Sequence, residues 1–132
     1  MFVDFYDLSK EMEMKRILNN TVREIKKAVR DLDKHGVALG AGGKAMTKEQ
    51  FLTKFFPFGL SWGANRGSVV SQLLDVDGCR RYFFYNFVDY SAGVVVSDLS
   101  TGRDVRDSSK EVVEAIASLL SHLQIYQSGR RL

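Results

Sequence analysis

The stretch SVVSQLLDVDGCRRYFFYNFVDY, residues 68–90, decides how this chain of 132 residues folds. Its first part, 68–76, and its last part, 79–90, are rich in the β-branched and aromatic residues that strands favour. Between them stands Asp77-Gly78, the strongest short signal for a two-residue hairpin, because such a turn needs residues that accept positive φ. The stretch therefore predicts two antiparallel strands joined by a tight turn.

The strand pattern continues toward the C-terminus. Ser91-Ala92-Gly93 is expected to turn the chain into VVVSDL, and Ser100-Thr101-Gly102 to turn it into a short further strand, RDVRD. Strands that follow one another at such short spacing pair with their neighbours in sequence. Residues 68–107 are therefore predicted to form an antiparallel β-meander of three to four strands.

Helices are predicted at both ends of the chain. Apolar residues recur every three or four positions over 9–35, which indicates a long amphipathic helix, and Ser9 can cap its first turn. The same periodicity predicts a C-terminal helix over 109–125, preceded by Ser108 and Glu111 in capping-box spacing.

The middle of the chain carries a weaker helical signal. Thr47 has capping-box spacing to a glutamine three residues later, and Pro57 ends the pattern, which predicts a short helix over 47–56. The following stretch, 61–68, is expected to be a loop. Helices, then a run of strands, then a helix predict an α+β fold, and the length fits one domain over 1–132.

The strand predicted at 79–90 is aromatic on both faces, whereas a sheet with one face in water alternates apolar and polar residues. Tyr82, Phe84, Val88 and Tyr90 would lie on one face, and Phe83, Tyr85 and Phe87 on the other. We expect both faces to be covered, and favour helices on both sides over a partner on one side. Base stacking is a further alternative, but this strand lacks the glycines of the RNA-binding strand motif.

The glycine-rich segment GVALGAGGKAMTKEQF, residues 36–51, invites comparison with a phosphate-binding loop. If Gly43 and Lys44 are aligned with the Gly-Lys of that motif, Ala38 replaces its first glycine and Ala45 its magnesium-binding hydroxyl. We therefore predict no nucleotide site here. Lys44, just before a helix N-terminus, keeps a looser role in binding an anion or a nucleic-acid phosphate.

Chemistry-bearing residues are sparse. The two histidines, His35 and His122, fall on different predicted helices, and Cys79 is the single cysteine, so no zinc site of conventional spacing is present in the sequence. A nucleophilic Cys79 paired with a histidine in space, its pKa lowered by Arg80 and Arg81, stays open as an alternative. One cysteine allows no internal disulfide, and this favours a reducing compartment.

We therefore expect a small non-enzymatic regulatory or inhibitory protein, of a kind that a phage genome would also encode, that binds another protein. It would need no cofactor or metal and act in the cytosol of a cell or host, with no membrane segment; a homodimer is an open possibility. Large aromatic residues anchor protein interfaces. The interface candidates are Phe55, Phe56, Phe58 and Trp62.

The first alternative is a nucleic-acid-binding protein. Residues 35–66 hold four basic side chains and one acidic one, within a chain of net charge +3. Such a basic segment favours phosphate contacts. The candidates are Lys44, Lys48, Lys54 and Arg66. The second alternative is an enzyme with Cys79 as its nucleophile.

Overall fold

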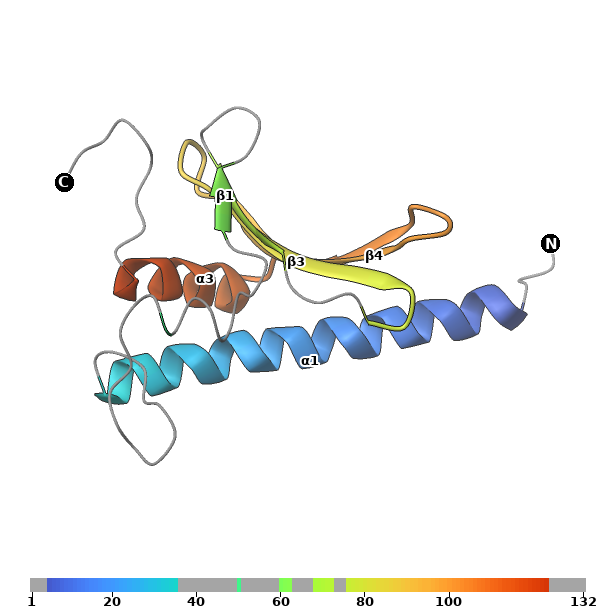
Figure 1. Ribbon diagram of the computed structural model, residues 1–132, viewed down its shortest axis with the longest axis horizontal. Coiled ribbons are helices and arrows are strands. Elements are labelled where there is room, and N and C mark those ends of the chain that lie inside the picture. Colours follow the sequence, from blue (N-terminus) through green and yellow to red (C-terminus); the bar gives the residue numbers. More distant parts are fainter. Residues whose placement is uncertain (1–4, 36–49, 51–59, 63–67, 73–75, 124–132) are drawn as a thin grey trace.

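The computed structural model describes residues 5–35, 50, 60–62, 68–72 and 76–123. Within these residues two helices and one antiparallel sheet form an α+β fold, as the sequence predicts (Figure 1). The elements are α1 (Phe5–His35), β1 (Leu60–Trp62), β2 (Ser68–Gln72), β3 (Cys79–Asn86), β4 (Ala92–Asp98), β5 (Asp104–Asp107) and α3 (Lys110–His122).

Within the described residues the sheet is a five-stranded antiparallel meander in the order β1-β2-β3-β4-β5. It confirms the predicted meander and adds a strand at its edge, because β1 pairs with β2 and aligns Leu60 with Ser71 and Trp62 with Val69. The predicted loop over 61–68 is therefore wrong at its first two residues. Three residues with a serine in the middle carry no strand pattern of their own, so only the pairing with β2 defines this strand.

The predicted Asp77-Gly78 hairpin is confirmed. Asp77 and Gly78 have φ of 52° and 75°, the left-handed values that a two-residue turn of this kind requires. Val76 and Cys79 close the turn, with Val76 N donating to Cys79 O at 2.8 Å and Cys79 N donating to Val76 O at 2.9 Å.

The next turn differs from the prediction. β3 ends at Asn86 rather than continuing to Tyr90, and β4 already begins at Ala92, so Ser91-Ala92-Gly93 is not the turn. The Asn86 side-chain oxygen accepts a hydrogen bond from Val88 N at 2.8 Å, and Asn86 N donates to Ser91 O at 2.7 Å. Asparagine side chains that bind the backbone two residues on favour turns over strands. Phe87, Val88 and Tyr90 therefore lie outside the strand, and their predicted alternation is wrong.

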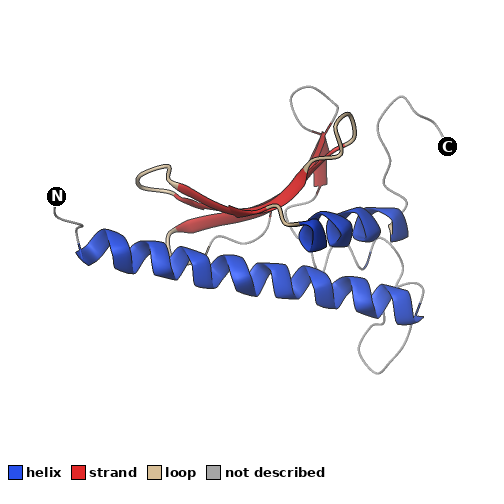
Figure 2. Ribbon diagram, turned by 180° about the vertical axis from the view of Figure 1, so that it is seen from behind, coloured by secondary structure: helices blue, strands red, loops and turns tan. Residues whose placement is uncertain are grey.

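Both described helices lie on the same side of the sheet, where α1 packs against β3, β4 and β5 and α3 lies beside α1 (Figures 1 and 2). The expectation that helices cover both faces is therefore not met by α1 and α3. The core fills the space between the helices and the sheet, and its fully buried side chains include Phe83, Val94 and Ile116.

The helix ends correct two predicted caps. α1 already includes Phe5, so Ser9 is an interior residue of the helix rather than its cap. The N-cap of α3 is Ser109, which makes no side-chain capping bond, so the predicted capping box starting at Ser108 is wrong. The predicted helix over 47–56 lies outside the described residues except for Gln50, which has a helical backbone.

Candidate functional site

One face of the sheet rests on the helices. Arg81 lies on this face, because Arg81 Nη1 donates to Thr21 Oγ1 and to Glu24 Oε2 of α1, both at 3.1 Å. Alternate residues of a strand share a face, so Cys79 and Phe83 point the same way, and both are fully buried. This face is the core side of the sheet.

The opposite side, which we call the distal face, is turned away from α1 and α3. Alternation and register assign it residues from three strands. These are Arg80, Tyr82, Phe84 and Asn86 of β3, Gly93, Val95 and Ser97 of β4, and Asp104 and Arg106 of β5. The sheet curves so that this face is concave (Figure 2).

The distal face has an apolar centre with charged ends. Val95 is 0% exposed although neither described helix lies over it, and the register sets it between Tyr82 on one side and Arg106 on the other. Tyr82 and Phe84 are partly exposed, and the arginines Arg80 and Arg106 are exposed. An aromatic and arginine surface of this kind can hold an apolar group and an acidic group at once.

Cys79 is placed for packing rather than for chemistry. Its side chain is 0% exposed and belongs to the core cluster. It directly follows the Asp77-Gly78 turn, and Asp77 lies 3.6 Å from the guanidinium of Arg16 in the first half of α1. His122 instead contacts Asp33 at the other end of α1.

The two ends of α1 are too far apart for a cysteine–histidine pair. At a rise of about 1.5 Å per residue, Arg16 and Asp33 are about 25 Å apart along the helix axis. His35 is the last residue of α1, so it lies beyond Asp33. Neither histidine can therefore reach Cys79, and the structure lends no support to a Cys79 nucleophile.

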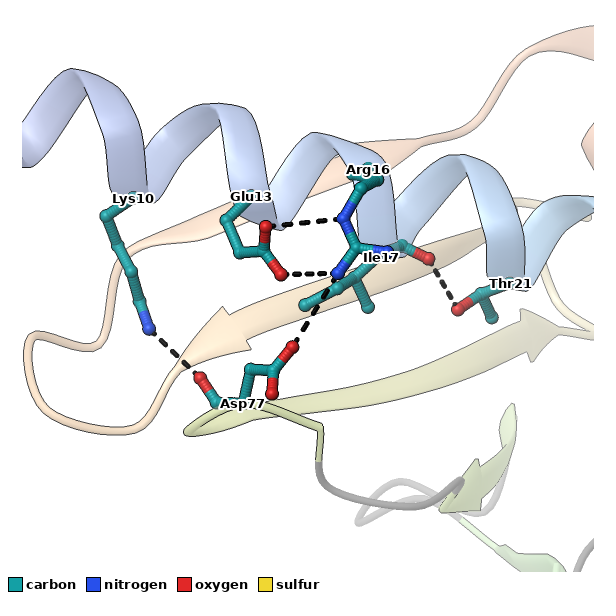
Figure 3. A network of polar contacts seen from close by, with 6 residues as sticks. All are labelled: Lys10, Glu13, Arg16, Ile17, Thr21 and Asp77. Carbon is teal, nitrogen blue, oxygen red and sulfur yellow. Dashed lines mark hydrogen bonds and ion pairs between the residues drawn. The ribbon is translucent and has the colours of Figure 1, made fainter.

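A polar network fastens the Asp77-Gly78 turn to α1 (Figure 3). Lys10 Nζ donates to Asp77 O at 3.1 Å, and Arg16 binds both Asp77 and Glu13. The hydrogen bond from Arg16 lowers the pKa of Glu13 below its usual value. Exposed ion pairs of this type contribute little to the free energy of unfolding. The network therefore fixes the position of the turn relative to α1 but adds little stability.

A small pocket of about 80 Å³ lies between α1 and the turn that joins β4 to β5. Its polar centre is Asp98, whose carboxylate accepts hydrogen bonds from Ser100 N at 3.1 Å, Ser100 Oγ at 3.0 Å and Thr101 Oγ1 at 2.9 Å. The backbone bond from Ser100, then the hydroxyl of Thr101, lowers the pKa of Asp98. These bonds tie the carboxylate to the residues of the turn, so Asp98 stabilises the β4–β5 hairpin.

The sequence candidates for an interface fall mostly outside the described residues. Phe55, Phe56 and Phe58 lie there, as do the nucleic-acid candidates Lys44, Lys48, Lys54 and Arg66. Trp62 is the last residue of β1, and its Cα is paired with that of Val69.

Reasoning from sequence raised a partner on one face of the sheet only as an alternative, and it did not include Arg80 in that face. It singled out Tyr82 and Phe84 as aromatic strand residues, but it assigned Arg80 and Arg81 to the thiol of Cys79. The two arginines instead point to opposite faces of the sheet, as their neighbouring positions in one strand require. That alternation was readable from the sequence, whereas the absence of α1 and α3 from one face was not.

Two searches of the described part of the chain were negative. No group of three or more histidine, cysteine or acidic side chains there is arranged to hold a metal ion. None of the helices in these residues has the length and apolar character needed to cross a membrane.

Comparisons with known proteins give no relative: no protein-family model, no curated protein and no solved structure matches this chain.

Proposed function

We propose that this protein is a small non-enzymatic binding or regulatory protein that acts through contact with another protein, and that the distal face is its contact surface. The observation that carries the proposal is the combination of partly exposed Tyr82 and Phe84 with exposed Arg80 on a face that α1 and α3 leave free. Aromatic residues and arginine are enriched at the centres of protein interfaces.

The chemistry of the distal face limits the partner. The partly exposed rings of Tyr82 and Phe84 favour an apolar side chain at the middle of the contact, and the positive charge of Arg80 favours an acidic residue near its edge. We therefore expect a partner protein that presents an apolar anchor next to an acidic residue. Trp62 remains a further interface candidate, since β1, which contains it, is an edge strand among the described strands. Phe55, Phe56 and Phe58 remain candidates from the sequence alone.

The test is affinity capture from a lysate of the native host, with one half of the lysate treated with nuclease. The wild-type chain is compared with Arg80→Glu and Tyr82→Ala, and with Arg30→Glu as a control, because Arg30 is an exposed residue of α1. We expect a protein that is retained after nuclease, is lost with both distal-face variants and is kept by the control. Thermal melts of all variants separate lost contact from lost folding. Capture that both distal-face variants retain would refute the proposal.

Nucleic-acid binding is the second candidate, and the observation that favours it is Arg80 beside the partly exposed aromatic ring of Tyr82. A cationic and aromatic strand surface can stack bases and contact phosphates. In the same experiment, capture that disappears with nuclease would select this candidate. Its affinity should then fall steeply with salt, because each phosphate contact releases counterions, and the basic candidates Lys44, Lys48, Lys54 and Arg66 would be tested next.

A further inference from the structure

Among the described strands, β5 forms one edge of the sheet and pairs with β4 and no other strand. Asp98 N donates to Arg103 O at 2.8 Å, so the backbone of Arg103 faces β4. Backbone groups alternate along an antiparallel strand, so those of Val105 and Asp107 also face β4. The N–H and C=O groups of Asp104 and Arg106 therefore point away from β4, where they meet no other strand of the described part of the chain and can pair with a further strand.

The sequence of this edge, Arg103-Asp104-Val105-Arg106-Asp107, is complementary to itself. If a second copy pairs antiparallel about a two-fold axis at Val105, Asp104 of each copy faces Arg106 of the other. In the same register Arg103 faces Asp107. Every charge thus meets an opposite charge, and such cross-strand pairs stabilise a sheet.

We propose that β5 is a self-association strand, through which two copies of this chain join their sheets edge to edge into one continuous antiparallel sheet. This inference does not depend on the proposed function: Asp104 and Arg106 also belong to the distal face, but the proposed contact with another protein uses Arg80, Tyr82 and Phe84.

Geometry and charge together select this register. An outward-pointing residue can only pair with another outward-pointing residue, so the two-fold axis must pass through a residue and not between two. An axis at Asp104 would set two aspartates against each other, and an axis at Arg106 would set two arginines against each other. Like charges directly opposite destabilise a sheet, so the axis at Val105 is favoured over its neighbours.

The side chains at the edge are available for this contact. Arg106 is exposed and makes no hydrogen bond or ion pair within the described part of the chain. Asp104 is also exposed, and it uses Oδ1 to accept a bond from Ser97 Oγ at 2.7 Å, which leaves Oδ2 for a partner.

An exposed apolar side chain lies on the flank of α1 nearest this edge. Glu11 marks that flank, because its carboxylate lies 3.9 Å from the guanidinium of Arg103. Leu8 is one turn away from Glu11 and is 47% exposed. A second copy at the β5 edge would remove apolar surface of Leu8 from water and so add to the strand pairing.

The test measures the dimer dissociation constant of the purified full chain by sedimentation equilibrium in low salt. Arg106→Glu and Asp104→Lys each create two like-charged pairs at the interface, and each should weaken the dimer about tenfold or more. The double variant Asp104→Lys with Arg106→Glu swaps the charges and should restore the dimer. Arg30→Glu, an equal charge change on α1, should leave the dimer unchanged, and circular dichroism checks that every variant is folded.

Three results would overturn the proposal. The wild-type chain could remain a monomer at the highest concentration reached, and a partner strand for β5 would then have to come from a different protein. Alternatively, a dimer could form that neither single variant weakens, which would assign the interface to a different surface. Finally, the double variant could fail to recover the affinity lost in the single variants, which would refute the register at Val105.

Discussion

Gly93 gives a quantitative test of how closely β4 and β5 pack on the distal face. A Cβ added at Gly93 would lie 2.4 Å from Ser108 Oγ, 3.1 Å from Asp107 O and 3.3 Å from Phe84 Cε1. The hydroxyl of Ser108 can rotate away, but the carbonyl of Asp107 belongs to the paired backbone of β5 and must move with the strand. Gly93→Ala is therefore an overpacking change.

The magnitude follows from two opposing effects. Overpacking in a filled site costs about 1–3 kcal/mol. Replacing glycine by alanine in a strand returns about 0.5–1 kcal/mol, because alanine loses less backbone freedom on folding. We expect the free energy of unfolding of Gly93→Ala to fall by about 1 kcal/mol, which corresponds to about 4 °C in Tm for a chain of this size.

A double-mutant cycle with Ser108 makes this prediction specific. Ser108→Ala alone should change the free energy of unfolding by less than about 0.5 kcal/mol, because Ser108 is exposed. In the Gly93→Ala background the same change should recover about half of the loss, since it removes the closest contact. Urea unfolding at 25 °C measures all four proteins. If Gly93→Ala is as stable as the wild type, or if Ser108→Ala does nothing in its presence, the packing argument is wrong.

Three further predictions concern other parts of the fold. Cys79→Ser should lower the free energy of unfolding by about 1–3 kcal/mol, because a hydroxyl would be buried in an apolar core. The thiol of the folded wild-type protein should also react slowly with a thiol reagent, because it is buried. Rapid labelling would instead support the nucleophile hypothesis. Gly78→Ala should cost about 1–2 kcal/mol and Gly78→Asn less, because φ is +75° and asparagine tolerates this region; equal melts for both variants would contradict that reasoning. The pKa of Asp98 is lowered in the folded state, so its contribution to stability is present above the unfolded pKa of about 3.9 and is lost as pH falls through the lower folded value. In acid unfolding followed by circular dichroism, Asp98→Asn should therefore lose less stability than the wild type as pH falls below about 3.9. An unchanged profile would show that Asp98 does not cause the loss of stability.

The candidate site was predicted from sequence in outline only. Aromatic residues on both faces of β3 indicated that the side away from the core would be unusual, and Tyr82 and Phe84 do lie there. The same reasoning extended the strand to Tyr90. A periodic pattern shows where strand-forming residues are, but it does not show where a side chain forms hydrogen bonds to the backbone and ends the strand. The hydrogen bonds around Asn86 end the strand, and they depend on the turn that they help to build.

The sequence by itself determined the elements whose signals are local. The repeat of apolar residues in α1, the Asp77-Gly78 turn and the succession of strands depend on backbone preferences within a few residues, so they can be read without knowledge of the fold. Tertiary structure alone decided three other features. These are the edge strand Leu60–Trp62, the placement of α1 and α3 on one face of the sheet, and the outward direction of the backbone N–H and C=O groups of Asp104 and Arg106. Each depends on pairing or packing between segments distant in sequence, and the chain has no local preference that fixes such contacts.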